Sequence, residues 1–172
     1  MTDTNDSPDR AQIPAGPITS RAEFQAAVRA FIVNAEAGGA RHLWWVSPDF
    51  ADWPLDEPAV VDALAHWARH PGAQLTWIGH DFERVRRTMP RLTRWRQTFA
   101  HVLKCWSPGE VPASDMPTLL VADHHAVLRV VDLERVRGWV RCEGADVQRA
   151  REEIDVILQR SSEAFPAVTL GL

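Results

Sequence analysis

The sequence predicts an α/β protein with a mixed sheet of about five strands flanked by helices. Short apolar stretches bounded by Gly or Pro alternate with segments whose apolar residues recur at helical spacing. Residues 118–123 and 126–131 are two further apolar stretches with only two residues between them. A connection this short fits an antiparallel hairpin and is too short for a parallel crossover. The sheet is therefore expected to contain parallel and antiparallel pairs.

The first 17 residues differ in composition from the rest of the chain. They are rich in Asp and Pro and contain almost no large apolar side chain, so burial cannot offset the entropy cost of ordering them. We predict a disordered tail over residues 1–17 and a single α/β domain over residues 18–172. With 45% hydrophobic residues, this length is enough for one domain with a substantial core.

Local signals indicate where the helices begin. Ser20 and Glu23 have the spacing of a capping box, which predicts a helix that runs to the glycines at 38 and 39. Asp81 can cap a short helix that ends near Arg87, and Pro90 suits the first turn of another helix through residue 100. An amphipathic pattern over residues 144–165 predicts a closing helix.

The strands before the hairpin come from short aromatic or β-branched stretches. We predict strands over residues 41–47, 73–79 and 101–107. An amphipathic helix over residues 58–70 separates the first two, and a strand, helix and strand of these lengths form a parallel unit. Trp53 lies in the Pro- and Asp-rich loop before this helix, and we expect it to be exposed.

Residues 84–104 form a basic segment in a protein of net charge −4. The segment contains six arginines, one lysine and no acidic residue. On a helix from Pro90, Arg91 and Arg94 fall opposite the apolar residues, so they are predicted to be exposed. Arg96 falls at the edge of the apolar face, where its stem can pack on the core while its guanidinium pairs with a carboxylate.

The basic segment has two interpretations. It can form a surface for anions or nucleic acid, and the candidate anion-binding residues are then Arg87, Arg91, Arg94 and Lys104. It can equally be a solvated helix whose arginines pair with acidic neighbours or with a partner subunit.

Familiar motifs of catalysis and cofactor binding are missing from the sequence. There is no G-x-G-x-x-G, G-x-x-x-x-G-K, G-x-S-x-G or C-x-x-C pattern, and we predict neither a cofactor nor a metal site. Two cysteines are too few for a disulfide framework, so both are expected to be thiols. No apolar run is long enough for a membrane span and no secretory signal is visible, which predicts a cytoplasmic protein.

In its order of elements, the chain from residue 19 to 165 resembles one half of a phospholipase D-like fold. Active members carry a His-x-Lys-x4-Asp motif whose His attacks phosphorus and whose Lys neutralises phosphate oxygens. With Asp123 as the Asp of the motif, the His position falls on Met116 and the Lys position on Thr118. Neither side chain can perform those steps. The chain is similar in this respect to uncharacterised bacterial proteins assigned to the fold without the motif. The alternative interpretation is that residues 118–132 are simply a β-hairpin and not a degenerate form of this motif.

Three functions follow from these interpretations. The resemblance implies a non-catalytic phospholipase D-like module that binds an anionic ligand or a protein partner. It also implies a homodimer, because two half-domains of this fold pair about a twofold axis to complete one site. The first alternative is a phosphodiesterase-type hydrolase with a rearranged site at Asp123, His124 and His125. The second is a nucleic-acid-binding protein that uses the basic segment.

Overall fold

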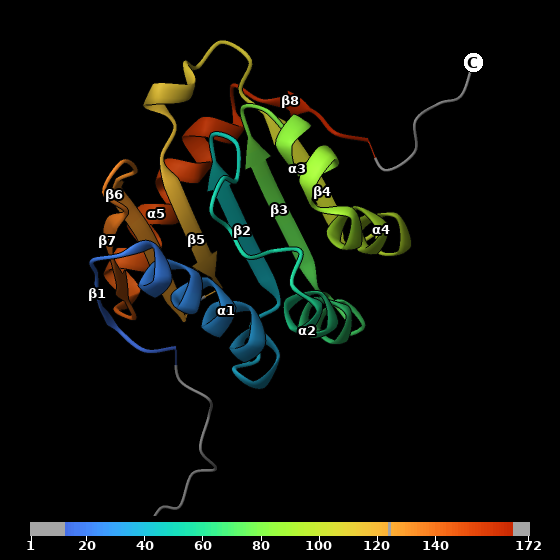
Figure 1. The fold of residues 1–172 in the computed structure, drawn as a ribbon, viewed down its shortest axis with the longest axis horizontal. Helices are drawn as coiled ribbons and strands as arrows, with labels where there is room; N and C mark the ends of the chain where they lie inside the picture. The colour runs from blue at the N-terminus through green and yellow to red at the C-terminus, as the bar shows by residue number, and fades with distance from the viewer. Residues whose placement is uncertain (1–12, 124, 167–172) are drawn as a thin grey trace, which may run out of the picture.

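The computed structural model describes residues 13–123 and 125–166, which form a mixed sheet with helices on both faces (Figure 1). The sheet has eight strands in the order β1-β7-β6-β5-β2-β3-β4-β8. The predicted α/β class and mixed sheet are confirmed, whereas the predicted number of about five strands is too low. Three strands of two to five residues escaped prediction because none has an extended apolar pattern: β1 (Gly16–Ile18), β7 (Arg137–Arg141) and β8 (Ser162–Glu163).

The centre of the sheet follows the predicted pairing. Its strands are β2 (His42–Ser47), β3 (Gln74–Gly79), β4 (Leu103–Ser107), β5 (Thr118–Ala122) and β6 (Ala126–Asp132). Strands β2, β3 and β4 are parallel, whereas β5 is antiparallel to both β2 and β6. The parallel unit and the hairpin expected from the sequence are therefore both present.

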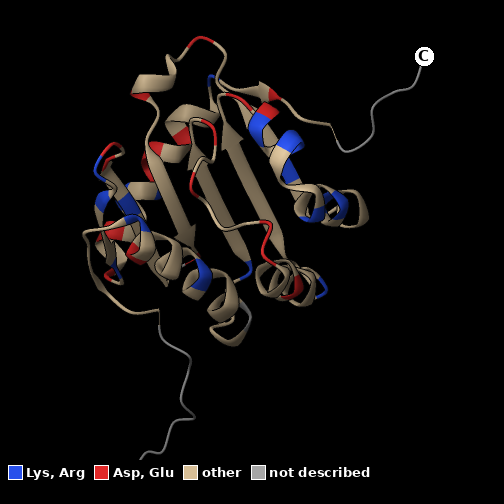
Figure 2. Ribbon diagram, viewed as in Figure 1, with Lys and Arg blue, Asp and Glu red and all other residues tan. Residues whose placement is uncertain are grey.

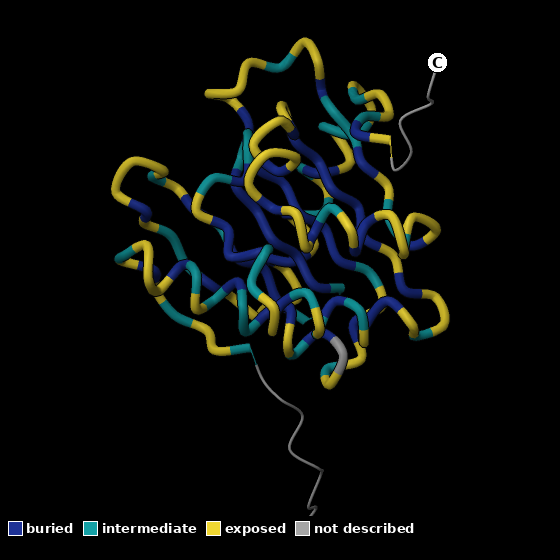
Figure 3. The backbone as a smooth tube through the Cα atoms, turned by 45° about the vertical axis from the view of Figure 1, so that its right-hand side comes forward, coloured by how far each residue is buried: buried dark blue, intermediate teal, exposed yellow. Residues whose placement is uncertain are grey.

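The helices divide the core into two layers. They are α1 (Arg21–Ala37), α2 (Pro58–Ala68), α3 (Glu83–Thr88), α4 (Pro90–Thr98) and α5 (Gly144–Leu158), with a short 3-10 turn, η1, at Ala113–Asp115. Helices α1 to α4 cover one face of the sheet, and α5 covers part of the other (Figure 1). The strands between them form the buried interior (Figure 3).

Alternation along each strand assigns side chains to the two faces. Trp45 and Trp77 pack beneath α1 to α4, whereas the neighbouring Trp44 and Ile78 belong to the cluster beneath α5. Successive residues of a strand point to opposite faces, so the same rule fixes the face of polar side chains on these strands.

The predicted helix starts at Pro58 and Pro90 are confirmed, and two further starts show the side-chain hydrogen bonds expected from the sequence. The Glu23 amide donates to the Ser20 hydroxyl, while the Glu23 carboxylate accepts hydrogen bonds from the amide and hydroxyl of Thr19. Helix α3 begins where the Glu83 amide donates to an Asp81 carboxylate oxygen. Polar side chains placed just before an apolar run therefore located these starts correctly.

Two expectations are wrong. The closing helix does not continue to Phe165 but ends at Leu158, because the chain then turns back to pair β8 with β4 and to bury Phe165. Trp53 is buried with 4% of its surface exposed, because the rings of Phe24 and Phe50 pack edge-on against it.

The remaining predictions concern the chain ends, the membrane and the cysteines. Of the predicted tail, residues 1–12 lie outside the described part, and Gly16–Ile18 pair with β7. Within the described residues, no helix is long and apolar enough to cross a membrane. Cys105 and Cys142 are both free thiols, as expected, and burial raises the pKa of Cys105 to about 12. The cytoplasmic location stays a prediction.

Candidate nucleic-acid interface

Most of the basic segment lies on two consecutive helices, α3 and α4, at the β4 side of the sheet (Figure 2). Both helices bury an apolar face on the core, through Val85 of α3 and through Leu92 and Trp95 of α4. Because the apolar residues take the inner face, most arginines must point outward. The exposed ones are Arg84, Arg86, Arg87, Arg91 and Arg94.

Acidic residues neutralise part of this basic surface. Arg84 Nε lies 3.1 Å from an Asp49 carboxylate oxygen, and Arg91 Nη1 lies 3.5 Å from Asp56. Arg86 has a longer contact with Glu83, 3.9 Å, within its own helix. These contacts join exposed arginines, so each is weak and screened by salt.

Arg87 and Arg94 carry the uncompensated charge. Neither forms an ion pair with any acidic residue in the described part of the chain. Arg94 shares a groove between α4 and α2 with Arg91, the acidic Asp62 and the apolar Pro58. The sequence correctly predicted that Arg91 and Arg94 are exposed.

Arg96 has a structural role, although its partners differ from those expected. It is only 4% exposed and donates to the carbonyl oxygens of Phe165 and Pro166 at 2.6 and 2.9 Å. Its guanidinium lies 3.7 Å from the centre of the Phe165 ring. The predicted carboxylate partner is wrong, because the C-terminal segment occupies the space beside the guanidinium. Burial lowers the pKa of Arg96, and the two carbonyl dipoles and the ring face stabilise its charge.

Lys104 does not join the arginines. Lys104 on β4 lies opposite Thr76 of β3, and Thr76 lies opposite Trp44 of β2. Trp44 belongs to the cluster beneath α5, so the Lys104 side chain is on the α5 face of the sheet. The sheet therefore separates the Lys104 side chain from α3 and α4. Of the four candidate anion-binding residues, Arg91 and Arg94 lie together on α4, Arg87 lies on the neighbouring α3, and Lys104 lies across the sheet from them.

Near Lys104 lies a small aromatic cluster centred on His42. The His42 ring stacks on Trp44 with 3.6 Å between centroids, and its Nε2 is 2.8 Å from the Thr76 hydroxyl. Burial lowers the pKa of His42 to about 4; the positive charges of Arg151 and Lys104 act in the same direction, and Asp123 opposes them. At neutral pH the ring is uncharged, so its Nε2 can accept a hydrogen bond from the Thr76 hydroxyl.

The residues of the supposed degenerate motif do not converge. Met116 lies just before β5 and Thr118 is its first residue; both are buried, whereas Asp123 follows the last residue of the strand. Five residues of extended strand place Asp123 roughly 16 Å beyond Thr118, and neither Met116 nor Thr118 can supply the nucleophile or the cation of the motif. His125 lies in the turn after Asp123, with its amide donating to the Ala122 carbonyl, and His124 lies outside the described residues.

The sequence indicated that the basic helices could pair with acidic neighbours, but it did not identify those partners. Asp49 and Asp56 belong to the loop between β2 and α2, about thirty-five positions before the arginines they contact. The only signal in the sequence was the density of acidic residues in that loop. Nothing in the linear pattern indicates which helix a loop carboxylate reaches.

The family of the chain is shown by a model that matches residues 21–165, described as a domain of unknown function, DUF7931. The chain belongs to the DUF7931 family. No curated protein matches it. Among solved structures, the DUF7931 chain is similar to TrmBL2, described as an archaeal chromatin protein with a novel mode of DNA binding. The TM-score is 0.61 at 8% identity; the match covers 94% of this chain and 57% of TrmBL2, and it shows a shared fold.

These comparisons correct the resemblance inferred from the sequence. The family is DUF7931, and a phospholipase D-like half-domain is not shown. The prediction of a non-catalytic phospholipase D-like module is therefore wrong. The hydrolase alternative at Asp123, His124 and His125 depended on the same resemblance and is not retained. The homodimer also depended on it and stays a prediction.

Proposed function

We propose that this DUF7931 protein binds double-stranded DNA through the exposed arginines of α3 and α4. The observation that carries the proposal is the concentration of cations in residues 84–104, which contain no acidic residue and place Arg87 and Arg94 at the surface without an acidic partner among the described residues. The fold shared with a DNA-binding chromatin protein supports it.

The chemistry of the surface suits the DNA backbone. A guanidinium presents a planar fork of donors that can bind two oxygens of one phosphate. Each phosphate neutralised in this way releases condensed counterions, which drives binding and makes it sensitive to salt. Contacts of this kind read no base edge, so we propose binding without sequence preference.

The charge distribution orients the proposed complex. The whole chain carries a net charge of −4, so the remainder of the protein repels a polyanion. Figure 2 shows basic positions along α3 and α4, with acidic positions in the loops at the top of the view and beside α2. A duplex is therefore expected to approach the outer side of α3 and α4.

The proposal is tested by fluorescence anisotropy with a labelled 20-base-pair duplex over a series of KCl concentrations. The Arg87→Ala/Arg94→Ala variant is expected to bind at least about tenfold more weakly than wild type. Its plot of log K against log salt should be shallower by about 2, since two phosphate contacts are lost.

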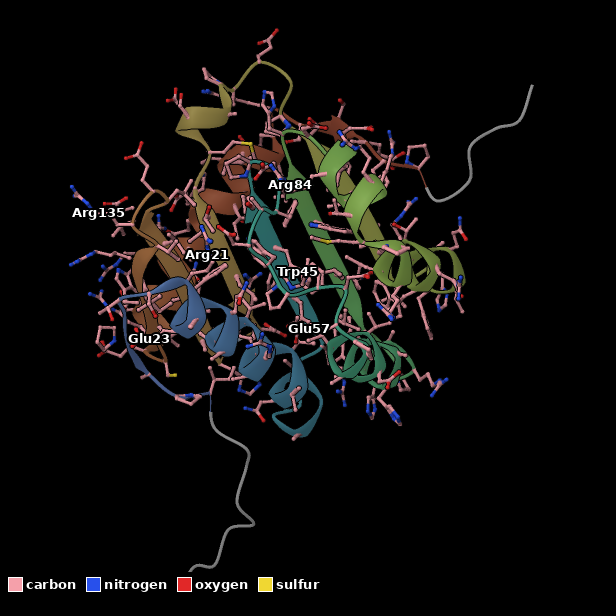
Figure 4. All side chains as sticks on the ribbon, in the orientation of Figure 1. Arg21, Glu23, Trp45, Glu57, Arg84 and Arg135 are labelled. Carbon is pink, nitrogen blue, oxygen red and sulfur yellow. The ribbon has the colours of Figure 1, made fainter. Side chains whose placement is uncertain are left out.

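The matched control is Arg135→Ala/Arg137→Ala, which removes the same charge from exposed residues of the β6–β7 hairpin, away from α4 (Figure 4). This variant should retain an affinity within about twofold of wild type. Equal losses in the two double variants would show that only net charge matters, and a wild-type protein that fails to bind the duplex at 50 mM KCl would overturn the proposed function.

A further inference from the structure

The loop between β2 and α2, residues 48–57, directs four carboxylates at arginines of three helices. Two reach α1, the helix that does not belong to the basic surface, and two reach α3 and α4. The pairs are Asp52 with Arg21 (3.1 Å), Glu57 with Arg29 (2.6 Å), Asp49 with Arg84 (3.1 Å) and Asp56 with Arg91 (3.5 Å). Figure 4 shows Arg21, Glu57 and Arg84 over the face of the sheet along which this loop runs.

The loop is anchored, so its carboxylates are held in place. Phe50 is fully buried and Trp53 is 4% exposed, and their rings pack edge-on at 5.2 Å. Phe50 has φ 58° and Asp52 has φ 65°, a left-handed conformation that Asp adopts readily but that is unfavourable for a bulky residue such as Phe. Packing of the Phe50 and Trp53 rings in the core keeps the loop backbone in this conformation, so the backbone positions of the acidic residues are fixed.

Asp56 makes contacts like those of a bound phosphate. One of its oxygens accepts a hydrogen bond of 2.9 Å from the Leu92 amide in the first turn of α4, and the other faces Arg91. An arginine and a backbone amide at a helix start are also the donors that commonly bind phosphate oxygens. Asp49 combines similar donors, with one oxygen near Arg84 and the other accepting the Ala51 amide at 3.0 Å.

We propose that Asp49 and Asp56 compete with DNA phosphates for Arg84 and Arg91 and thereby limit the affinity of the interface. This inference rests on the proposed function, because it concerns the same arginines and the same ligand. Arg84 and Arg91 are 51% and 59% exposed, so rotation of their side chains is enough to exchange a carboxylate for a phosphate. While these two ion pairs are intact, the guanidinium groups of Arg84 and Arg91 are not available to DNA phosphates.

The test compares two double variants of the same loop by the same anisotropy assay at 100 mM KCl. Asp49→Asn/Asp56→Asn removes the two charges that face α3 and α4, while the Asn oxygen can still accept the Leu92 amide. Asp52→Asn/Glu57→Gln removes two charges from the same loop that face α1. Both variants change the net charge equally, so the comparison separates local competition from the field of the whole protein.

The Asp49→Asn/Asp56→Asn protein is expected to bind the duplex about tenfold more tightly than wild type, and the control less than threefold more tightly. Adding Arg84→Ala and Arg91→Ala to the first variant should abolish the gain. Urea titration shows whether each protein is folded, and if Asp56→Asn weakens the fold, the single Asp49→Asn variant should still gain about threefold.

Equal gains in the two loop variants, or a gain that survives loss of Arg84 and Arg91, would overturn the competition. The proposed function would still stand if Arg87→Ala/Arg94→Ala weakened binding in the same assay. Absence of duplex binding by the wild-type protein would overturn both the competition and the proposed function.

Discussion

The guanidinium of Arg96 lies over the Phe165 ring, 3.7 Å from its centre, and donates to the carbonyl oxygen of the same residue, 69 positions away along the chain. The ring is also contacted by Phe82, stacked at 5.0 Å, by Trp77, edge-on at 5.9 Å, and by the Arg86 guanidinium, 4.8 Å from the ring centre. This arrangement fixes the segment after β8 against α4 and extends the aromatic core to the end of the domain.

We expect Arg96→Ala to destabilise the protein by roughly 2–3 kcal/mol, because it removes buried stem packing, the ring contact and two hydrogen bonds to carbonyl oxygens. Arg94→Ala should change the free energy of unfolding by no more than about 0.5 kcal/mol, since Arg94 is exposed. Urea titration followed by tryptophan fluorescence measures both. Equal stability of the two variants would contradict the structural role of Arg96.

The β6–β7 pair requires glycine at position 138. A Cβ atom built there would lie 2.0 Å from the backbone oxygen of Arg129, and a backbone atom inside a sheet cannot move aside. We expect Gly138→Ala to cost more than about 3 kcal/mol, since the strands must separate or shift register. Gly109→Ala is the control, because a Cβ atom added at Gly109 would have open space for 4 Å around it. A Gly138→Ala protein with the urea midpoint of the control would show that this pairing is wrong.

Two buried tryptophans should respond differently to the same substitution. Trp67 Nε1 donates to the Ala40 carbonyl at 2.8 Å, whereas Trp45 Nε1 has no hydrogen-bond partner among the described residues. Replacement by Phe removes similar volume at both sites, but only at Trp67 does it leave a buried carbonyl without its donor. Trp67→Phe should therefore cost about 1–2 kcal/mol more than Trp45→Phe in thermal or urea unfolding. The reverse order would refute the assignment.

The lowered pKa of His42 gives the fold a specific dependence on pH. Its pKa is about 4 in the folded protein against an ordinary value of 6.5, so between these values the unfolded chain binds more protons than the folded one. The stability that neutral His42 contributes is fully present above pH 6.5 and is lost as the pH falls toward 4. Between pH 7.5 and 5, wild type should lose roughly 1 kcal/mol more than His42→Gln, allowing for partial exposure of the ring.

The control for His42 is His66→Gln, which replaces an exposed histidine of α2. This variant controls for the replacement of one histidine of the chain by Gln. The measurement is the urea midpoint at each pH, and parallel curves for His42→Gln and wild type would show that the ring titrates in the same way in both states.

The parts of the fold that were predictable from the sequence are those whose signals are local. Apolar alternation and helix starts located α1 to α4, β2, β3 and the hairpin, because each depends on residues within one or two turns of the chain. The edge strands β1 and β8 were missed, since their pairing depends on β7 and β4, which are distant in sequence. The end of α5 was misplaced for a related reason, because Phe165 packs on a core that the helical pattern does not reveal.

For the candidate site, the sequence established the charge but not its geometry. Helical spacing correctly separated exposed Arg91 and Arg94 from buried Arg96. It could not show that Lys104 lies across the sheet, nor that Asp49 and Asp56 come to the arginines, because both facts depend on strand order and loop path. Only tertiary structure shows which charges share a surface.

The short edge strands of the sheet affect how closely copies of this protein can be packed without aggregating. Any polyanion that gathers many copies of this protein also brings their sheets close together, and unpaired strand edges are the surfaces on which proteins aggregate. Here the outermost strands are only three and two residues long, β1 and β8. Such short edges offer few backbone groups to a neighbouring copy, so the fold can tolerate high local concentration without one sheet extending into the next.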